Sequence, residues 1–259
     1  SNFDPKVAYI AVTAFRSGNY APLLYRTDDA GKTWRSIASD LPANGPVRVV
    51  REDPKNRNLL FAGTEFGLFA SVDAGAHWLP FGGLPTVMVD DLAIHPRDHD
   101  LVIATHGRSI YIVDDITPLE DMTPEIAAQP ANLFAPRPAA GFVPLDGYEA
   151  WTGRGDFRGE NPPEGAILWV WVKEYSGDPV KLTITNAADQ TVANLTSPGT
   201  PGLNRLVWDL KPSADVLTSY GGEGRKFVRP GDYTVTLSYG KTSVKQKISV
   251  TIAEGVETR

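Results

Sequence analysis

The sequence lacks cysteine entirely, and its 259 residues include only 2 Met and 4 His. The absence of cysteine excludes disulfides, structural zinc sites with cysteine ligands and thiol catalysis. No stretch approaches the roughly 18 consecutive apolar residues of a membrane-spanning helix. Basic residues are outnumbered by acidic ones, for a formal net charge of −6. This balance argues against nucleic acid as a partner, because phosphate binding needs a basic surface.

Glycine and proline are plentiful instead, with 24 and 21 copies, which favours many short strands joined by turns over long helices. The chain is long enough for two domains, each with its own core. It has no initiating Met and no signal peptide, and it opens with Ser1-Asn2. We therefore interpret it as a piece of a longer protein, whose targeting signal would lie in another part.

A motif of the form Ser/Thr-x-Asp-x-Gly-x-x-Trp occurs twice, and we call the two copies the first and second motif turns. Each Asp can accept hydrogen bonds from amides of its own turn, each Gly supplies a positive φ, and each Trp anchors the turn between sheets. The pattern predicts a structural role, and the alternative of calcium binding lacks carboxylates at loop-ligand spacing. The motif residues are Thr27, Asp29, Gly31 and Trp34 in the first turn, and Ser71, Asp73, Gly75 and Trp78 in the second.

The sequence around the motif repeats. Residues 61–73 align with residues 103–115 at an offset of 42 without a gap, and Asp-Pro or His-Pro recurs upstream in each unit. A period in the low forties with four short strand segments is typical of β-propeller blades, so we predict two to three blades. The first three strands are expected at residues 47–52, 59–63 and 67–72 of one blade and at residues 88–94, 101–105 and 109–114 of the next.

The motif resembles the Asp-box of the BNR (bacterial neuraminidase) repeat, found in sialidases, xyloglucanases and sortilin-type propellers. Residues 63–78 and 104–119 together are similar to large bacterial BNR-repeat glycosyl hydrolases with a sortilin-like propeller. The resemblance covers roughly residues 4–138. It implies a propeller fold and an extracellular, periplasmic or cell-envelope location. It does not imply one reaction, because binding proteins and assembly factors also carry Asp-boxes.

The repeat stops after residue 119. Thr123-Pro124-Glu125 predicts the start of a short helix, and residues 131–139 are a candidate for the last strand of the final blade. The following segment, rich in Gly and Pro, reads as an interdomain connection. The predicted domains are a partial β-propeller at residues 1–119, a connecting segment at residues 120–163 and a β-sandwich at residues 164–259.

The third of these regions alternates apolar and polar residues in six to seven short segments, which predicts an immunoglobulin- or fibronectin-like sandwich. Residues 202–212 and 228–240 resemble the small Ig-like domains that follow bacterial secreted enzymes and that of the flagellar hook-capping protein. In that resemblance Trp208 is a core residue and Tyr233 a corner residue. The fold class expected for the whole chain is all-β.

The turns between the second and third strands of each blade face away from the motif turns, on the side where Asp-box enzymes place their clefts. Glu65, His106 and Arg108 lie in these turns and are the catalytic candidates. A Glu can act as acid or base, and an Arg can hold a carboxylate bidentately. The structural alternative pairs Arg108 with Asp114 or Asp115 and leaves His106 bonded to the backbone. A single Glu does not supply the carboxylate pair of a glycosidase, and the arginine triad of a sialidase is missing.

We expect no cofactor and no metal ion. A cluster of possible metal ligands sits at a turn between the first two strands of a blade, where Asp and Pro are common turn formers, so a turn is the simpler interpretation. Its members are His95, Asp98, His99 and Asp100.

Three functions stay open. In the first, Glu65 and Arg108 line a sugar cleft that other blades complete. In the second, a sortilin-like module binds a glycan or peptide on the same face without chemistry. In the third, the sandwich serves as an assembly scaffold. We expect the chain itself to be non-catalytic. We also expect its open blade edges to need the remainder of the propeller or another copy of the chain.

Overall fold

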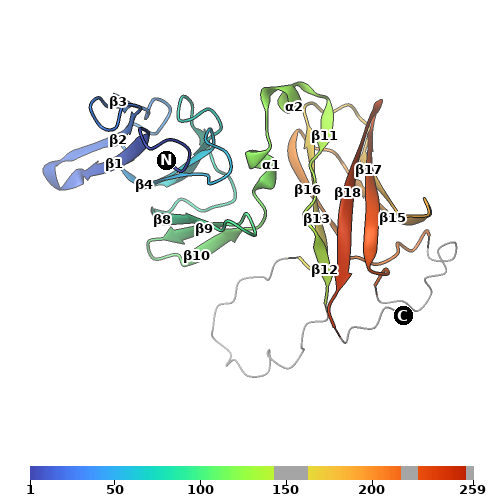
Figure 1. The fold of residues 1–259 in the computed structure, drawn as a ribbon. Coiled ribbons are helices and arrows are strands. Elements are labelled where there is room, and N and C mark those ends of the chain that lie inside the picture. The colour runs from blue at the N-terminus through green and yellow to red at the C-terminus, as the bar shows by residue number, and fades with distance from the viewer. Residues whose placement is uncertain (143–162, 217–226, 255–259) are drawn as a thin grey trace. The chain divides into compact units, whose positions relative to one another are not determined.

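The structure is a computed structural model that describes residues 1–142, 163–216 and 227–254. Much of the predicted connecting segment, residues 143–162, lies outside this range. The chain divides into two compact units, Ser1–Met122 and Thr123–Arg259, both almost entirely β (Figure 1). The described helices are all too short to cross a membrane.

Unit 1 consists of three antiparallel sheets, which we call blades 1, 2 and 3. A short 3-10 helix, η1 (Phe15–Ser17), joins β1 to β2, and α1 (Thr117–Glu120) follows β10. The all-β fold and the partial propeller are confirmed. The strands are β1 (Ala8–Ala14), β2 (Asn19–Thr27) and β3 (Arg35–Ser36) in blade 1, β4 (Val47–Glu52), β5 (Leu60–Thr64), β6 (Gly67–Ser71) and β7 (Leu79–Pro80) in blade 2, and β8 (Val89–Ile94), β9 (Leu101–Thr105) and β10 (Ile110–Val113) in blade 3.

The blades bury apolar side chains between them, because alternate residues of each strand point to opposite faces of its sheet. Leu24 and Ile37 of blade 1 pack with Leu60, Phe69 and Trp78 of blade 2. The next interface joins blades 2 and 3, and it is closed at its end by α1. Its buried members are Val49, Leu59, Phe61, Leu68, Val89, Leu92, Leu101, Ile103 and Ile116.

Gly63 lies where a strand of blade 2 packs tightly against blade 3. A Cβ atom at this position would lie 2.6 Å from Val49 Cγ1 and 2.7 Å from Val89 Cγ1, the latter across the interface. Such distances leave no room for a side chain, so the glycine lets the strands of the two blades approach each other.

The ungapped alignment at an offset of 42 is wrong for β9. In blade 2, Thr64 pairs with Gly67 around a two-residue turn, whereas in blade 3 the Thr105 amide bonds the Ser109 carbonyl around three residues. The extra residue is compensated by a shorter turn before β9. Strand β9 therefore corresponds to β5 at an offset of 41, while β8 and β10 keep 42. A one-residue shift moves each side chain to the other face, so Ile103 corresponds to Ala62 and not to Phe61.

Unit 2 begins with α2 (Pro124–Ala128), capped as predicted by Thr123 Oγ1, which accepts from the Ile126 amide at 3.2 Å. Its eight described strands form two sheets, a β-sandwich of three and five strands. The first has the order β11-β13-β16 (Ala131–Leu133, Ala166–Val172, Gly202–Trp208), and the second β12-β18-β17-β14-β15 (Ala139–Gly141, Thr242–Ile252, Gly231–Tyr239, Val180–Thr185, Thr191–Ser197).

Residues 131–139 do not complete the final blade, which corrects the sequence-based expectation. Strand β11 pairs antiparallel with β13, and β12 pairs parallel with β18, so both strands belong to the sandwich. Ala131 and Leu133 are fully buried in its core. Burial against an apolar sheet outweighs the short segment's ability to extend a blade edge.

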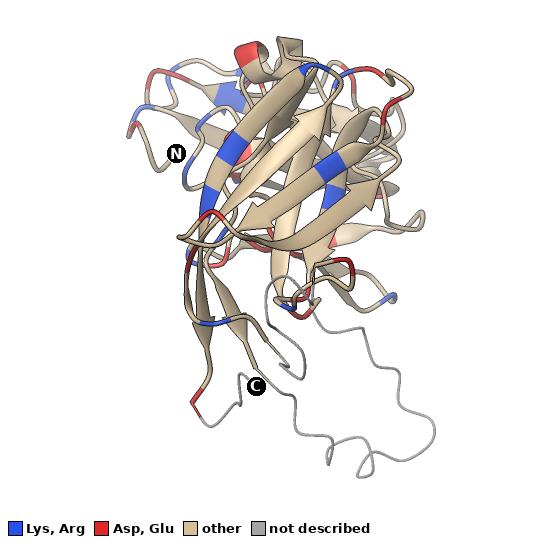
Figure 2. Cartoon of the chain, turned by 90° about the vertical axis from the view of Figure 1, so that its right-hand side faces the viewer, with Lys and Arg blue, Asp and Glu red and all other residues tan. Residues whose placement is uncertain are grey.

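The outer face of the five-stranded sheet is polar. Thr234 and Thr236 of β17 stand opposite Lys247 and Lys245 of β18, and Lys181 of β14 stands opposite Ser238. Figure 2 shows basic residues on the strands and acidic residues mostly in the loops. Exposed lysines on sheets discourage strand addition by other chains.

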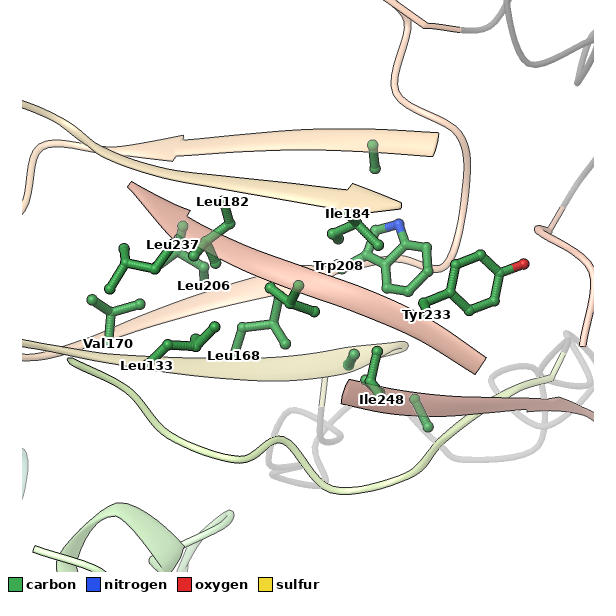
Figure 3. Close-up of a cluster of buried hydrophobic side chains, with 14 of the residues drawn as sticks. Leu133, Leu168, Val170, Leu182, Ile184, Leu206, Trp208, Tyr233, Leu237 and Ile248 are labelled. Atoms are coloured by element: carbon green, nitrogen blue, oxygen red, sulfur yellow. The ribbon is translucent and has the colours of Figure 1, made fainter. Parts of the chain in front are cut away.

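The inner faces of the two sheets meet in one apolar core, part of which Figure 3 shows. Trp208 is 1% exposed and meets Tyr233 edge to face, with ring centroids 5.4 Å apart. The Tyr233 hydroxyl donates to the Arg229 carbonyl at 2.6 Å, four residues upstream. This is the contact that defines a tyrosine corner, so Trp208 and Tyr233 lie in the core and at the corner, as expected.

Candidate functional site

The first motif turn closes on itself through side-chain hydrogen bonds. Thr27 Oγ1 donates to Asp29 Oδ1 at 2.8 Å and accepts from the Gly31 amide at 2.9 Å. Asp29 also accepts from the hydroxyl and the amide of Thr33, at 2.6 and 2.9 Å. These two bonds from Thr33 are the main reason that the pKa of Asp29 is lowered to about 2.

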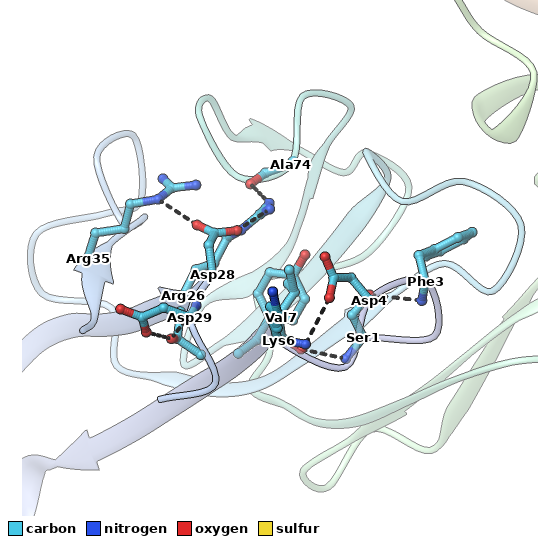
Figure 4. Close-up of polar contacts among 12 residues, drawn as sticks. Ser1, Phe3, Asp4, Lys6, Val7, Arg26, Asp28, Asp29, Arg35 and Ala74 are labelled. Atoms are coloured by element: carbon cyan, nitrogen blue, oxygen red, sulfur yellow. Dashed lines mark hydrogen bonds and ion pairs between the residues drawn. The ribbon is translucent and has the colours of Figure 1, made fainter. Parts of the chain in front are cut away.

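Asp28, next to this carboxylate, lies outside the turn network. It pairs with Arg26 at 2.6 Å and with Arg35 at 3.5 Å, while Arg26 also donates to the Ala74 carbonyl of blade 2 (Figure 4). A cavity of about 360 Å³ opens beside Arg26, and it is lined by Ser1, Asp4, Val7, Tyr9, Arg26, Asp28, Glu52, Arg57, Asn58 and Ala74. Burial, and secondarily Glu52, raises the pKa of Tyr9 in this cavity to about 12.

The second motif turn repeats the geometry. The Gly75 amide donates to Ser71 Oγ at 2.9 Å, and the His77 amide donates to Asp73 Oδ1 at 2.9 Å. Partial burial alone would raise the pKa of Asp73, but the bonds from His77 and Ser71 lower it below its usual value. Asp73 in turn raises the pKa of His77, whose Nδ1 lies 2.7 Å from Asp73 Oδ2. Both motif carboxylates are thus engaged within their own turns.

The two motif tryptophans differ in their surroundings. Trp78 is 3% exposed and its indole Nε1 donates to the Ile37 carbonyl of blade 1 at 2.6 Å. Trp34 is 39% exposed and its Nε1 donates at 3.2 Å to Gly31 of its own turn. Trp78 therefore anchors one blade to another, and Trp34 does not.

The opposite side of unit 1 carries the predicted site residues in the β5–β6 and β9–β10 turns. Glu65 Oε2 pairs with Arg48 Nη2 at 2.8 Å, and His106 Nδ1 lies 3.1 Å from Asp90 Oδ2. The side chain of His106 is 72% exposed. It does more than bond the backbone, although its amide also donates to the Met88 carbonyl.

Arg48 and Asp90 are equivalent residues of the inner strands β4 and β8. Each is the extra residue of a β-bulge, since the ladder shifts between Val47 and Val49 and again between Val89 and Asp91. A bulge re-aims one side chain and is common beside functional sites. Both blades thus place a charged bulge residue against the adjacent turn, with the positive group on the strand in blade 2 and the negative group on the strand in blade 3. We call these contacts the two bulge pairs.

The Arg48 guanidinium also stacks over the Phe15 ring of η1, with 4.9 Å between its Cζ and the ring centroid. Blade 1 thereby contributes to the same side of unit 1 as the first bulge pair. Phe66, beside Glu65, is 49% exposed. The ion pair with Arg48 holds the Glu65 carboxylate in place beside this aromatic ring.

Arg108 is exposed and has no hydrogen bond or ion pair with any residue that the structure describes. The predicted alternative, a pair with Asp114 or Asp115, is not observed among the described contacts. An exposed guanidinium of this kind can bind a ligand carboxylate through two parallel hydrogen bonds.

Sequence reasoning missed Arg48 and Asp90. Both follow a valine at the start of an inner strand, and they stand at the repeat offset of 42 from each other. Two charged residues at equivalent positions of apolar strands are the sequence signal that could have identified them. The sequence could not show the bulges, because a bulge is defined by the partner strand.

A buried polar cluster was also missed. Asp53 and the side chain of Glu120 are buried, and His99 Nδ1 lies 2.8 Å from Glu120 Oε1. Lys55 Nζ lies 3.3 Å from Glu120 Oε2. Burial, and secondarily the neighbouring Glu120, raises the pKa of Asp53. Within the described ranges no group of three or more possible ligands is arranged to hold a metal ion.

The remaining members of the cluster of possible metal ligands, His95, Asp98 and Asp100, serve the turn before β9. His95 Nδ1 accepts from the Asp98 amide at 3.1 Å, and Asp100 accepts from the Asp115 amide at 3.0 Å. Asp98 also pairs with Arg97. The structure therefore spreads these four residues over turn contacts and α1.

No protein-family model matches the chain, and no curated protein matches it. Among solved structures it is similar to a GH74 xyloglucanase from Xanthomonas campestris, with 14% identity and a TM-score of 0.34 over 94% of this chain and 37% of that one. A second is the BSP domain of a biofilm-associated protein, with 12% identity and a TM-score of 0.24 over 76% of this chain and 23% of that one. The chain spans well under half of either structure, and TM-scores of this size do not establish a shared fold.

Proposed function

We propose that this chain is a non-catalytic binding part of a larger BNR/Asp-box repeat protein of the glycosyl-hydrolase-like group. In this proposal the protein acts outside the cell or in the envelope, and the sandwich is an Ig-like domain. Support comes from the two motif turns and from the Tyr233 corner contact. The ligand is a glycan that carries carboxylates.

The observation that carries the proposal is that the two bulge pairs lie at equivalent turns of neighbouring blades, β5–β6 and β9–β10, and that Arg108 is in the second of these turns. The Glu65 carboxylate is bound to Arg48, and His106 is bound to Asp90, so neither candidate is poised as an isolated acid or base. Arg108 supplies a charge without a described partner, and Phe15 and Phe66 supply apolar surface. This composition suits recognition of an acidic sugar, which presents carboxylates and an apolar ring face.

The proposal is tested by affinity electrophoresis in gels that contain polygalacturonate, alginate or neutral xyloglucan. We expect the acidic polysaccharides to retard the chain and xyloglucan to leave it unchanged. Arg108→Ala should lose most of the retardation, and Arg48→Ala part of it. Arg35→Ala, which removes a similar exposed charge on the motif-turn side, is the matched control. Equal retardation of Arg108→Ala and the parent chain would contradict the proposal.

Turnover is tested in the same samples by an assay for new reducing ends. We expect no increase over the buffer rate. Turnover that Glu65→Gln abolishes would show that the side of unit 1 with the β5–β6 and β9–β10 turns is catalytic. It would overturn the non-catalytic assignment.

A sortilin-like peptide binder is the second candidate, and Phe66 favours it, because an exposed aromatic beside an ion pair also suits a peptide side chain. Binding to a panel of fluorescent acidic peptides, measured by anisotropy, separates the two. Peptide binding that needs Phe66 and Arg108, without retardation by polysaccharide, would favour this alternative.

A further inference from the structure

The buried polar cluster of unit 1 joins three parts of the chain. Asp53 belongs to the turn before β5, His99 belongs to the turn before β9, and Glu120 is the last residue of α1. Asp53 is fully buried, and so is the side chain of Glu120. Burying two carboxyl groups costs free energy unless their oxygens find hydrogen-bond donors, so the donors of this cluster have to be traced one oxygen at a time.

Two of the four carboxyl oxygens have donors. Asp53 Oδ1 accepts from the amides of Lys55 and Asn56, both at 2.8 Å, and Glu120 Oε1 lies 2.8 Å from His99 Nδ1. The other two, Asp53 Oδ2 and Glu120 Oε2, are buried and have no hydrogen-bond partner among the described residues. The Lys55 ammonium lies 3.3 Å from Glu120 Oε2, which is the distance of an ion pair but lacks hydrogen-bond geometry.

A single proton can satisfy both of the remaining oxygens. Burial raises the pKa of Asp53 most, and the charge of Glu120 and a hydrogen bond with its carboxyl group raise it further. That hydrogen bond needs a proton, because an ionised carboxylate can only accept. A proton on Asp53 Oδ2 turns this oxygen into a donor and gives Glu120 Oε2 the partner that it lacks.

The surrounding charges also favour one bound proton. Asp121 adds a third carboxyl group, whose Oδ1 lies 2.9 Å from the Lys55 ammonium. Lys55 is the one permanent cation of the cluster, and it faces the three carboxyl groups together with His99. A metal ion is the poorer occupant, because the ammonium already lies beside Glu120 Oε2. Within the described ranges, moreover, no group of three or more possible ligands is arranged to hold one.

We propose that Asp53 and Glu120 form a proton-binding site, in which one proton lies between Asp53 Oδ2 and Glu120 Oε2 and holds the end of α1 against the turn before β5. We call this site the carboxyl latch. Release of the proton to solvent leaves two buried carboxylates that repel each other, and their repulsion falls when Glu120 moves away. The last turn of α1 therefore opens as pH rises.

The latch lies where the chain leaves unit 1, because α1 ends just before Met122, the last residue of that unit. Opening has a local readout. The Glu120 amide donates to the Ile116 carbonyl at 3.2 Å, and the Asp121 amide donates to the Thr117 carbonyl at 2.9 Å. Protection of these two amides from hydrogen exchange reports whether the end of α1 is formed.

NMR of the chain labelled with carbon-13 at its Asp and Glu carboxyl carbons tests the shared proton. We expect the Asp53 and Glu120 carbons to shift in the same step, at higher pH than exposed carboxyl groups, because coupled groups share their macroscopic pKa values. Asp53→Asn and Glu120→Gln assign the two signals, and each should abolish the joint step. Asp121→Asn is the matched control, since it removes the neighbouring exposed carboxylate and should leave the joint step in place.

Hydrogen exchange over the same pH range tests the latch. The protection factors of the Glu120 and Asp121 amides should fall by about tenfold or more across the joint step, while those of the β5 amides stay constant. Asp53→Asn should keep both α1 amides protected at every pH, because the amide group of Asn donates to Glu120 without needing a proton.

An Asp53 carbon that titrates while the Glu120 carbon stays unchanged would overturn the shared proton, and so would two carbons that both titrate with the exposed carboxyl groups. Constant protection of the α1 amides through a joint step would overturn the latch. If Asp53→Asn fails to fold, the titrations of the parent and of Asp121→Asn decide. These measurements contain no saccharide, so this inference and the proposed function fail separately.

Discussion

The two motif turns have the same internal hydrogen bonds, yet their tryptophans have different environments. Trp78 is buried against blade 1, while Trp34 is 39% exposed. The local sequence therefore builds the turn without help, but the anchoring role of the tryptophan needs a neighbouring blade. The third repeat makes a third kind of joint, in which the buried Glu120 of α1 contacts His99 and Lys55.

The largest expected effect separates the two tryptophans. Trp78→Ala removes a buried ring and leaves the Ile37 carbonyl unpaired, so it should lower the free energy of unfolding by about 3–5 kcal/mol. Trp34→Ala should lower it by about 1 kcal/mol or less, as for other surface positions. Urea unfolding followed by circular dichroism measures both. Equal losses would mean that burial in the blade interface does not distinguish the two turns.

The motif glycines give the next largest difference. Gly31 and Gly75 have φ of 85° and 86°, so alanine strains both turns by about 1–2 kcal/mol. A Cβ on Gly75 would also lie 2.8 Å from Ile37 Cδ1, whereas the nearest atom to one on Gly31 is 3.8 Å away. Gly75→Ala should therefore cost about 1–3 kcal/mol more than Gly31→Ala. Thermal unfolding of the two variants checks this, and the reverse order would exclude the close contact with Ile37.

The third joint should respond to pH in the opposite direction to the two motif carboxylates, Asp29 and Asp73. Burial and Glu120 raise the pKa of Asp53 above 3.8 in the folded state. Its contribution to stability is therefore present below about pH 4 and is lost as pH rises through the raised pKa. Asp53→Asn should stabilise the chain at pH 7, and the gain should vanish near pH 4. If Asp53→Asn destabilised the chain at both pH values, the ionised Asp53 carboxylate would not be unfavourable in the folded state.

The smallest expected effects concern the motif carboxylates. The pKa of Asp29 is lowered to about 2, so its stabilising contribution is present above the unfolded value of 3.8 and is lost between about pH 4 and pH 2. Asp29→Asn should remove this loss of stability between about pH 4 and pH 2. In the second turn the raised pKa of His77 adds stability that is lost above pH 6.5, as pH rises through the folded value. His77→Thr, which places the equivalent of Thr33 in the second turn, should remove only the loss of stability above pH 6.5. Melting temperatures measured from pH 2 to pH 8 check both variants.

The repeat and its strands could be predicted from the sequence because side-chain alternation and turn residues are local. The position of β9 could not, since two one-residue changes in neighbouring turns cancel in an ungapped alignment. Residues 131–133 look like any short edge strand, and only the apolar surface of β13 draws them into the sandwich. At the candidate site, Glu65, His106 and Arg108 were visible as turn residues. Their partners Arg48 and Asp90 depend on bulges that only strand pairing defines.

Hydrogen exchange of the tryptophan indole N–H groups by NMR tests most directly whether the motif tryptophan is a joint between blades. The account predicts that Trp78 Nε1–H, buried and bonded to the Ile37 carbonyl, exchanges only through opening of the blade interface. Trp34 Nε1–H, on an exposed ring, should exchange many-fold faster in the monomeric chain. Equal exchange rates for the two groups would contradict the account.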